Sequence, residues 1–375
     1  MIYHPEHHWW CDAAMTSLDS YITLGRSGLR VSPLTLGTMT FGEDWGWGAA
    51  PETSEAILDE YLDRGGNVVD TANVYTNGHS EKIIGDFFAA RSGLRERVVL
   101  STKFFGNLHP GDPNAGGAGR KALIAQLEES LRRLQTDYVD LYWLHNWDRR
   151  APLEETLRAL DDLVTTGKVR YIGLSDVPAW VAAQAHTIAE FRGWTPVTAL
   201  QLEYSLLERT TEGELLPMAE DLGIGVLPWS PLRGGQLSGK YVRNNGTPAD
   251  SRRTRLSEGP TESDWTVIET VARVAAELGV GSAQVALAWV RSRPAVSSTL
   301  IGARTIDQLR SNLASLEITL APEQLAALNE PSTPSLNFPA AVITEMSPTF
   351  GFGGATVDGV ELPVWPQLLT SSARY

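Results

Sequence analysis

Eight short apolar runs alternate with amphipathic segments between residues 34 and 302, and this rhythm constrains the fold more than any other feature of the sequence. Such alternation is typical of a parallel sheet whose strands are joined by crossover helices. Eight strands in this arrangement predict a single α/β domain, a (β/α)8 TIM barrel. The expected strands span 34–37, 67–71, 98–103, 139–145, 170–175, 197–204, 224–230 and 298–302.

The segments between the runs have the pattern of helices that pack on a sheet. Apolar residues recur three and four positions apart in 123–134, 153–164 and 268–278, which gives each helix one apolar face. A doubly wound sheet is the rival architecture, but its dinucleotide site usually opens with G-x-G-x-x-G after the first strand. Here the first strand runs into GTMTFGEDWGWG, which lacks that spacing. The pattern therefore favours the barrel.

Composition excludes several function classes. The chain has 375 residues, is 42% hydrophobic and 20% charged, and carries a net charge of −14. This acidic balance argues against nucleic acid or an anionic membrane as partner, because phosphate binding needs clustered Lys and Arg. No run approaches the roughly 18 apolar residues of a membrane span, and the single cysteine fits a reducing compartment. We expect a cytoplasmic protein.

The barrel is expected to span 17–330, with a tail at each end. Residues 1–16 show no periodic pattern and are expected to be disordered or loosely packed. They contain His4, His7, His8 and Cys11, a possible metal cluster. A frayed tail is the favoured interpretation, because nothing rigid would position these ligands, so no metal is expected.

Residues 331–375 form the second tail, which is rich in Pro, Gly, Ser and Thr. It also contains Phe338, Phe350, Phe352 and Trp365, and pure linkers lack such aromatic residues. We expect it to fold back over the barrel as a lid across the active-site mouth, with a disordered end as the alternative.

Three consecutive strands end in an ionisable group. The second ends in Asp70, the third in Lys103 and the fourth in His145, and Tyr75 follows the second strand in a loop. Barrels of this kind place catalytic groups at the carboxyl ends of their strands, and neighbouring strand ends can converge. Taken singly, each residue is more often a cap, a solvated lysine, a packing tyrosine or a structural histidine. Their joint occurrence favours a catalytic site.

These four side chains suit a proton transfer. A phenol is a poor acid at neutral pH, but a neighbouring ammonium favours phenolate and brings the phenol toward the working range. Lys103 would provide that ammonium, and Asp70 would keep it charged and oriented. His145 would donate or relay a hydrogen bond to a substrate oxygen. Tyr75 would protonate a carbonyl oxygen as hydride reaches the carbonyl carbon.

The motifs DTANVY, STK and LH resemble the Asp-Tyr-Lys-His tetrad of the aldo-keto reductases, and the resemblance extends from about residue 24 to 328. It implies the barrel fold and reduction of aldehydes or ketones with a nicotinamide cofactor, usually NADPH, with NADH as the alternative. QLEYSLL, PWSPL and SGKY are similar to the bacterial aryl-alcohol-dehydrogenase-like and potassium-channel β-subunit branch. The resemblance implies these cofactor-binding residues: Thr38, Met39, Asp70, Ser175, Asp176, Gln201, Trp229, Ser230, Pro231, Leu232, Gly234, Lys240, Gly302, Arg304, Gln308 and Asn312.

The implied contacts differ along this set. The resemblance assigns the nicotinamide amide to Ser175 and Gln201 and ring stacking to Trp229, and a Gly-rich loop at 230–240 suits the pyrophosphate. Arg304 can bind a ribose phosphate, which favours NADPH. Asp176 departs from the asparagine that relatives often have after the serine, and an ionised carboxylate accepts hydrogen bonds without donating any.

Substrate selection is expected in loops around the mouth of the barrel, where Trp45, Trp47 and Trp147 could contact a bulky carbonyl compound. A carbonyl or alcohol of low molecular mass is the expected partner, and a homo-oligomer remains open. The alternative function is a cofactor-binding regulatory subunit with little turnover, like the channel β-subunits. A metal-dependent hydrolase would need several His and Asp ligands at strand ends, where His145 is the single histidine.

Overall fold

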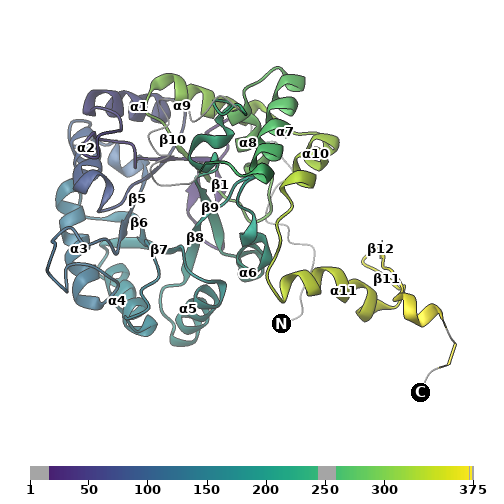
Figure 1. Ribbon diagram of the computed structural model, residues 1–375. Coiled ribbons are helices and arrows are strands. Elements are labelled where there is room, and N and C mark those ends of the chain that lie inside the picture. Colours follow the sequence, from purple (N-terminus) through teal and green to yellow (C-terminus); the bar gives the residue numbers. More distant parts are fainter. Residues whose placement is uncertain (1–16, 244–258, 371, 374–375) are drawn as a thin grey trace.

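The computed structural model describes residues 17–243, 259–370 and 372–373, which form a barrel with an extended C-terminal segment (Figure 1). Eight parallel strands in the order β10-β3-β4-β5-β6-β7-β8-β9 line the barrel, surrounded by helices. The strands are β3 (Leu34–Gly37), β4 (Val68–Asp70), β5 (Val99–Phe104), β6 (Val139–Leu144), β7 (Val169–Ser175), β8 (Val197–Glu203), β9 (Gly225–Trp229) and β10 (Thr299–Gly302).

The last two strands close the barrel through their backbones. The Val226 amide donates to the Ala295 carbonyl over 3.1 Å, and the Ser297 amide donates to the Val226 carbonyl over 2.8 Å. The eight predicted strands are all present, each within two residues of the expected bounds. The predicted (β/α)8 barrel is therefore confirmed.

The predicted helical faces are also confirmed. The leucines at 123, 127, 131 and 134 are buried against the sheet, as are the apolar residues at 268, 271 and 274. At the start of α7 the Thr261 hydroxyl accepts from the Asp264 amide and the Asp264 carboxylate accepts from the Thr261 amide, a capping box. The helices are α1 (Pro51–Asp63), α2 (His79–Ala89), α3 (Arg120–Leu134), α4 (Leu153–Thr165), α5 (Ala179–Arg192), α6 (Leu215–Leu222), α7 (Glu262–Leu278), α8 (Ser282–Arg291), α9 (Ile306–Leu313), α10 (Pro322–Ser332) and α11 (Ala340–Phe352).

The interior of the barrel is a packed core that a short hairpin closes at the amino-terminal end. The hairpin pairs β1 (Ile22–Thr23) with β2 (Arg30–Val31), and its buried side chains pack with Leu227 and Trp143. Trp143 fills the space beside Gly173 on the neighbouring strand, where an added Cβ would lie 2.3 Å from the indole ring. Catalytic groups are thus confined to the opposite, carboxyl end of the strands.

The C-terminal segment leaves the barrel after α10. Figure 1 shows α11 and the small hairpin of β11 (Thr356–Val357) and β12 (Val360–Glu361) running away from the barrel. Next to the barrel, Leu336 and Ala340 lie beside Gly213. Farther out, Phe350 and Trp365 pack edge to face with ring centroids 4.7 Å apart. The lid remains a prediction, because α11 and this hairpin extend away from the barrel (Figure 1).

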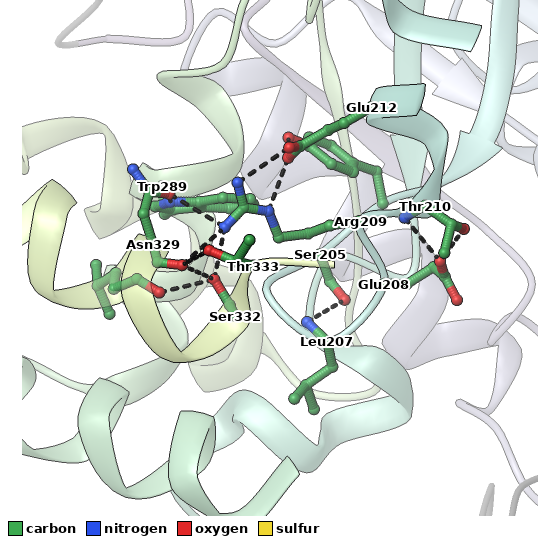
Figure 2. A network of polar contacts seen from close by, with 12 residues as sticks. Ser205, Leu207, Glu208, Arg209, Thr210, Glu212, Trp289, Asn329, Ser332 and Thr333 are labelled. Atoms are coloured by element: carbon green, nitrogen blue, oxygen red, sulfur yellow. Dashed lines mark hydrogen bonds and ion pairs between the residues drawn. The ribbon is translucent and has the colours of Figure 1, made fainter. Parts of the chain in front are cut away.

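A buried arginine ties this end of the chain to the barrel (Figure 2). Arg209 follows β8 and binds the Glu212 carboxylate through Nε and Nη2, at 2.8 and 3.0 Å. Its Nη1 donates to the Ser332 hydroxyl over 2.7 Å and to Asn329 of α10 over 3.3 Å. The guanidinium also lies 5.0 Å from the ring centroid of Trp289. One side chain from the loop after β8 therefore contributes two of the polar contacts that hold α10 on the barrel.

We expect Arg209→Met to lower the free energy of unfolding by about 2–4 kcal/mol, because it leaves the half-buried Glu212 without its cation and α10 without two hydrogen bonds. Urea unfolding monitored by circular dichroism measures this loss. Arg273→Met is the matched control, since Arg273 pairs with Glu277 on an exposed helix face and such pairs contribute at most about 1 kcal/mol. Equal losses in the two variants would contradict the bracing role.

Some predictions lie outside the described residues, namely the loose tail at 1–16 and its His/Cys cluster. Within the part of the chain that the structure describes, no group of three or more His, Cys, Asp or Glu side chains could bind a metal ion. No single described helix is long and apolar enough to cross a membrane. The consecutive pair α7 and α8 meets that test jointly, but the two helices bend by 99°.

Candidate active site

A cavity of about 730 Å³ opens at the carboxyl end of the barrel. Its wall runs from Asp70, Tyr75 and His145 at one end to Gln308 and Asn312 at the other. Residues at the ends of seven of the eight strands, or in the loops that follow them, thus surround one elongated space. Its size lies in the range of ligand pockets, and its walls are mostly apolar with a few polar groups that converge.

Asp70 and Lys103 form a buried ion pair beneath the cavity. Asp70 is 1% exposed and Lys103 is fully buried, and the Lys103 ammonium donates to the Asp70 carboxylate and to the Thr71 carbonyl, the latter over 2.9 Å. The other Asp70 oxygen accepts from Ser101 over 2.6 Å. Burial alone would lower the pKa of Lys103, but the charges of Asp70 and Tyr75 raise it above its ordinary value. The lysine therefore stays cationic.

Tyr75 points its phenol toward this pair from a short 3₁₀ turn, η1 (Tyr75–Gly78). Lys103 Nζ lies 3.3 Å from the phenol oxygen and donates to it. The turn is fixed because Thr76, in the left-handed region with φ 46°, donates its hydroxyl to the Phe41 carbonyl over 2.8 Å. The ammonium can thus stabilise negative charge that develops on the phenol oxygen when the proton leaves.

His145 completes the group one residue after β6. Its backbone amide donates to the Phe104 carbonyl over 3.0 Å, and its ring lies edge to face with Tyr75 at 5.8 Å between centroids. Burial and the nearby Lys103 charge lower the pKa of His145 to about 3. At neutral pH the imidazole is therefore uncharged, with one N–H donor for a substrate oxygen.

We expect the His145 imidazole to stay neutral from pH 8 down to pH 5. An unfolded chain would protonate it near 6.5, whereas the folded chain resists until about 3, so acidification through this window lowers stability on account of this residue. NMR of ¹⁵N-labelled histidines measures the titration, with His145→Gln for assignment. Exposed His109, paired with Glu129, is the internal comparison. A midpoint near 6.5 for His145 would contradict its desolvated position.

Four residues predicted at the nicotinamide end come together on one wall. Ser175, Asp176, Gln201 and Trp229 all line the cavity at the ends of β7, β8 and β9. Gln201 Nε2 donates to the Asp70 carboxylate over 3.3 Å, which couples this wall to the tetrad. Among the sixteen predicted cofactor residues, Thr38 is the exception. It lies outside the wall and donates its hydroxyl to the Asp70 carbonyl over 3.0 Å.

The predicted phosphate loop is compact and rich in left-handed residues. Ser230 has φ 53° and Gly235 has φ 99°, and the Gly234 amide donates to the Ser230 hydroxyl over 3.1 Å. A Cβ added to Gly235 would meet no atom closer than 4.0 Å, so open space lies in front of this backbone. Pro231, Leu232 and Lys240 line the same part of the cavity. Such a loop suits a bound phosphate.

At the far end, α9 presents Gln308 and Asn312 of the predicted polar face, whereas Arg304 lies two residues before this helix begins. The Arg304 amide donates to Gln308 Oε1 over 2.8 Å, and Asn312 Nδ2 donates to the Gly302 carbonyl over 3.1 Å. The cavity wall includes all four of these residues. An elongated cavity with an aromatic face at one end, a glycine-rich turn in the middle and an arginine at the other fits a dinucleotide.

The three tryptophans predicted at the mouth of the barrel have different surroundings. Trp47 lines the cavity and packs on Trp45, with ring centroids 5.8 Å apart. Trp147 packs edge to face on Trp180 of α5 instead. Sequence reasoning also missed part of the wall. Four missed polar residues are Thr40, Ser238, Asp307 and Ser311, and the last two were detectable because they share the helical face of Arg304 and Gln308.

Comparison with known proteins agrees with this geometry. Residues 33–332 match the aldo/keto reductase family. An uncharacterized oxidoreductase of Bacillus subtilis is 43% identical over 83% of this chain and 95% of its own length. A norsolorinic acid reductase of Emericella nidulans is 36% identical over 85% and 83%. An aryl-alcohol dehydrogenase [NADP(+)] of Phanerodontia chrysosporium is 33% identical over 83% and 85%.

The fold and the cavity thus define an oxidoreductase that acts on carbonyl compounds or the corresponding alcohols. The chain belongs to the aldo/keto reductase family. The predicted resemblance is confirmed, and the relatives include a bacterial oxidoreductase, a fungal reductase and a fungal aryl-alcohol dehydrogenase. Members of the family generally use a nicotinamide cofactor.

Proposed function

We propose that this protein reduces an aldehyde or ketone to an alcohol with NADPH, or catalyses the reverse reaction, and that Tyr75 supplies the proton. One observation carries the proposal: the phenol oxygen of Tyr75 lies 3.3 Å from the Lys103 ammonium at the wall of the cavity. A carbonyl oxygen beside that phenol could accept its proton, and the Lys103 ammonium would stabilise the phenolate that remains.

Each residue of the tetrad has a distinct task. When bound, the nicotinamide would supply hydride for the carbonyl carbon, and the two electrons of the C=O π bond would move to the oxygen. Tyr75 gives its proton to that oxygen, and the Lys103 ammonium stabilises the resulting phenolate. Neutral His145 donates a hydrogen bond to the same oxygen, which keeps the carbonyl in place. Asp70 orients Lys103 and takes no proton itself.

The side chains of the cavity wall and the names of the related proteins indicate the class of substrate. The cavity contains the aromatic faces of Trp47, Tyr75 and Trp229, which suit planar aromatic rings. The names of two relatives contain the words aryl-alcohol dehydrogenase. We infer that aromatic aldehydes and ketones are preferred to sugars, because planar aromatic rings can stack on these faces.

Oxidation of NADPH and NADH against aromatic, aliphatic and sugar aldehydes tests the proposal. The expected result is turnover with NADPH and aromatic aldehydes, followed as loss of cofactor absorbance. Tight NADPH binding without turnover across the panel would favour a regulatory subunit instead. The absence of cofactor binding would contradict both functions.

Replacement of Arg304 tests the cofactor preference separately. Arg304 lies in the cavity wall two residues before α9 begins, where a guanidinium can bind the 2′-phosphate that NADPH has and NADH lacks. We expect Arg304→Ala to raise KM for NADPH by about 10- to 100-fold and to change KM for NADH little, because a charge-assisted hydrogen bond contributes about 1.5–3 kcal/mol.

The control for that change is on α9, six residues after Arg304. Arg310 of α9 binds Glu60 over 3.0 and 3.1 Å outside the cavity. Arg310→Ala is therefore expected to leave both KM values near those of the unaltered protein. Equal increases for NADPH and NADH in Arg304→Ala would show that Arg304 does not recognise the phosphate.

A further inference from the structure

Asp176, the residue after β7, has no task in the proton transfer described above, yet its carboxylate is part of the cavity wall. Its Oδ1 accepts a hydrogen bond from Trp229 Nε1 over 3.0 Å. Its backbone is fixed as well, because its amide donates to the Gln201 carbonyl over 3.2 Å. Asp176 has φ 48°, in the left-handed region that aspartate tolerates better than most residues. The carboxylate is thus held at the edge of the Trp229 ring.

The other charged side chains near Asp176 already form ion pairs with partners of opposite charge. Glu203 at the end of β8 lies 2.6 Å from the Arg233 guanidinium, and the Lys103 ammonium is paired with Asp70. Within the described residues Asp176 itself takes part in no ion pair. Its hydrogen-bond partner is the neutral indole N–H. The nicotinamide end of the cavity therefore presents an acidic side chain without a cation of its own.

We propose that Asp176 makes this subsite distinguish the two redox states of the cofactor, so that its carboxylate favours the cationic ring of NADP⁺ over the neutral ring of NADPH. The inference rests on the proposed function, since it takes the nicotinamide to lie beside Trp229. The two forms of the cofactor have the same phosphates and sugars, and they differ at the ring by one positive charge. A carboxylate in a partly desolvated wall attracts that charge.

The preference has a consequence for the direction of the reaction. Donation of hydride creates the positive ring charge next to a negative group that is already in place. The carboxylate therefore stabilises the product state of carbonyl reduction and needs no rearrangement to do so. Replacement of Asp176 by asparagine keeps an oxygen that can accept from the Trp229 indole while it removes the charge, so the charge can be tested separately from the shape.

The preference also depends on pH. Burial at the cavity wall raises the pKa of Asp176 to about 6, with Glu203 raising it further and the Trp229 hydrogen bond and Lys103 opposing the rise. A cationic ring lowers this pKa again, whereas a neutral ring that displaces water does not. Binding of NADP⁺ near pH 6 therefore releases a proton. Affinity for NADP⁺ is expected to improve as pH rises through 6, and affinity for NADPH is not.

The test measures Kd for NADPH and for NADP⁺ by fluorescence titration between pH 5 and pH 8. The ratio of Kd for NADPH to Kd for NADP⁺ is expected to rise by about tenfold across this range, the effect of a difference of one pKa unit between the two complexes. Taking the ratio removes the contribution of the 2′-phosphate, which also titrates near pH 6 but is present in both forms. In Asp176→Asn the ratio is expected to be constant.

Asp307→Asn is the matched control, because Asp307 lines the same cavity at the far end from Trp229, where the two cofactor forms are identical. A second measurement uses the unaltered protein alone: calorimetric titration with NADP⁺ and with NADPH at pH 6 in buffers of different ionisation enthalpy. The difference in proton release between the two forms reports Asp176, because the 2′-phosphate is present in both. A constant ratio, or equal proton release with the two cofactor forms, in the unaltered protein overturns the inference and leaves carbonyl reduction standing. A pH-dependent ratio that persists in Asp176→Asn also overturns it. Failure of both cofactor forms to bind overturns the proposed function itself.

Discussion

Tyr75→Phe is expected to lower the turnover number by about 10²- to 10⁴-fold, the usual contribution of a general acid. The phenol lines the cavity and lies within hydrogen-bond distance of the Lys103 ammonium, at 3.3 Å. Phenylalanine keeps the ring and its edge-to-face packing on His145 but has no proton to give. Single-turnover kinetics with an aromatic aldehyde, together with NADPH titration, separate the chemical step from cofactor binding.

Cofactor affinity should change little in this variant, because Trp229 and the loop at 230–240 are untouched. Tyr21→Phe is the matched control. Tyr21 precedes the hairpin at the opposite end of the barrel, where its hydroxyl donates to the Gly65 carbonyl over 2.8 Å. A turnover number in Tyr75→Phe within about twofold of the unaltered protein would exclude Tyr75 as the acid.

Lys103→Met is expected to lower both stability and activity. The variant leaves the Asp70 carboxylate buried without its cation, and breaking such a pair costs about 3–5 kcal/mol. It also removes the charge that stabilises the Tyr75 phenolate, so we expect turnover to fall by about 10³-fold or more. The midpoint of urea unfolding and the turnover number, measured on the same preparations, give the two effects.

A second substitution separates the two effects of Lys103. Asp70→Asn/Lys103→Met removes both charges and is expected to regain part of the lost stability but no activity. Lys82→Met is the surface control, because Lys82 pairs with Asp86 one turn away on α2 over 2.6 Å, a pair that contributes at most about 1 kcal/mol. Recovery of turnover in the double variant would show that the tetrad works without its cation.

Much of the barrel could be predicted from the sequence because each strand is specified by a short run of neighbouring residues. A strand buried on both faces is a short continuous apolar run, and each of the eight runs became a strand. The tetrad was predictable for a related reason. Asp70, Lys103 and His145 interrupt apolar runs at the point where parallel strands end, and those ends meet at one side of the barrel.

The rest depends on contacts between distant segments, which a pattern of spacing does not contain. Trp147 is two residues after His145, yet its ring packs on Trp180 of α5 and is not part of the cavity wall. The hydrogen bond between Asp176 and Trp229 joins residues 53 positions apart, and Arg209 binds Ser332 from 123 positions away. Nothing near any of these residues in the sequence identifies its partner.

The close approach of Trp143 to Gly173 limits how this barrel can diverge. An added methyl group at 173 would lie 2.3 Å from the indole, so alanine there requires a smaller ring or an aliphatic side chain at 143. A smaller side chain at 143 can be introduced first, because loss of the indole leaves room that a methyl group at 173 can later fill. Homologous barrels should therefore show correlated substitution at these two positions, with the change at 143 preceding the change at 173 along any lineage.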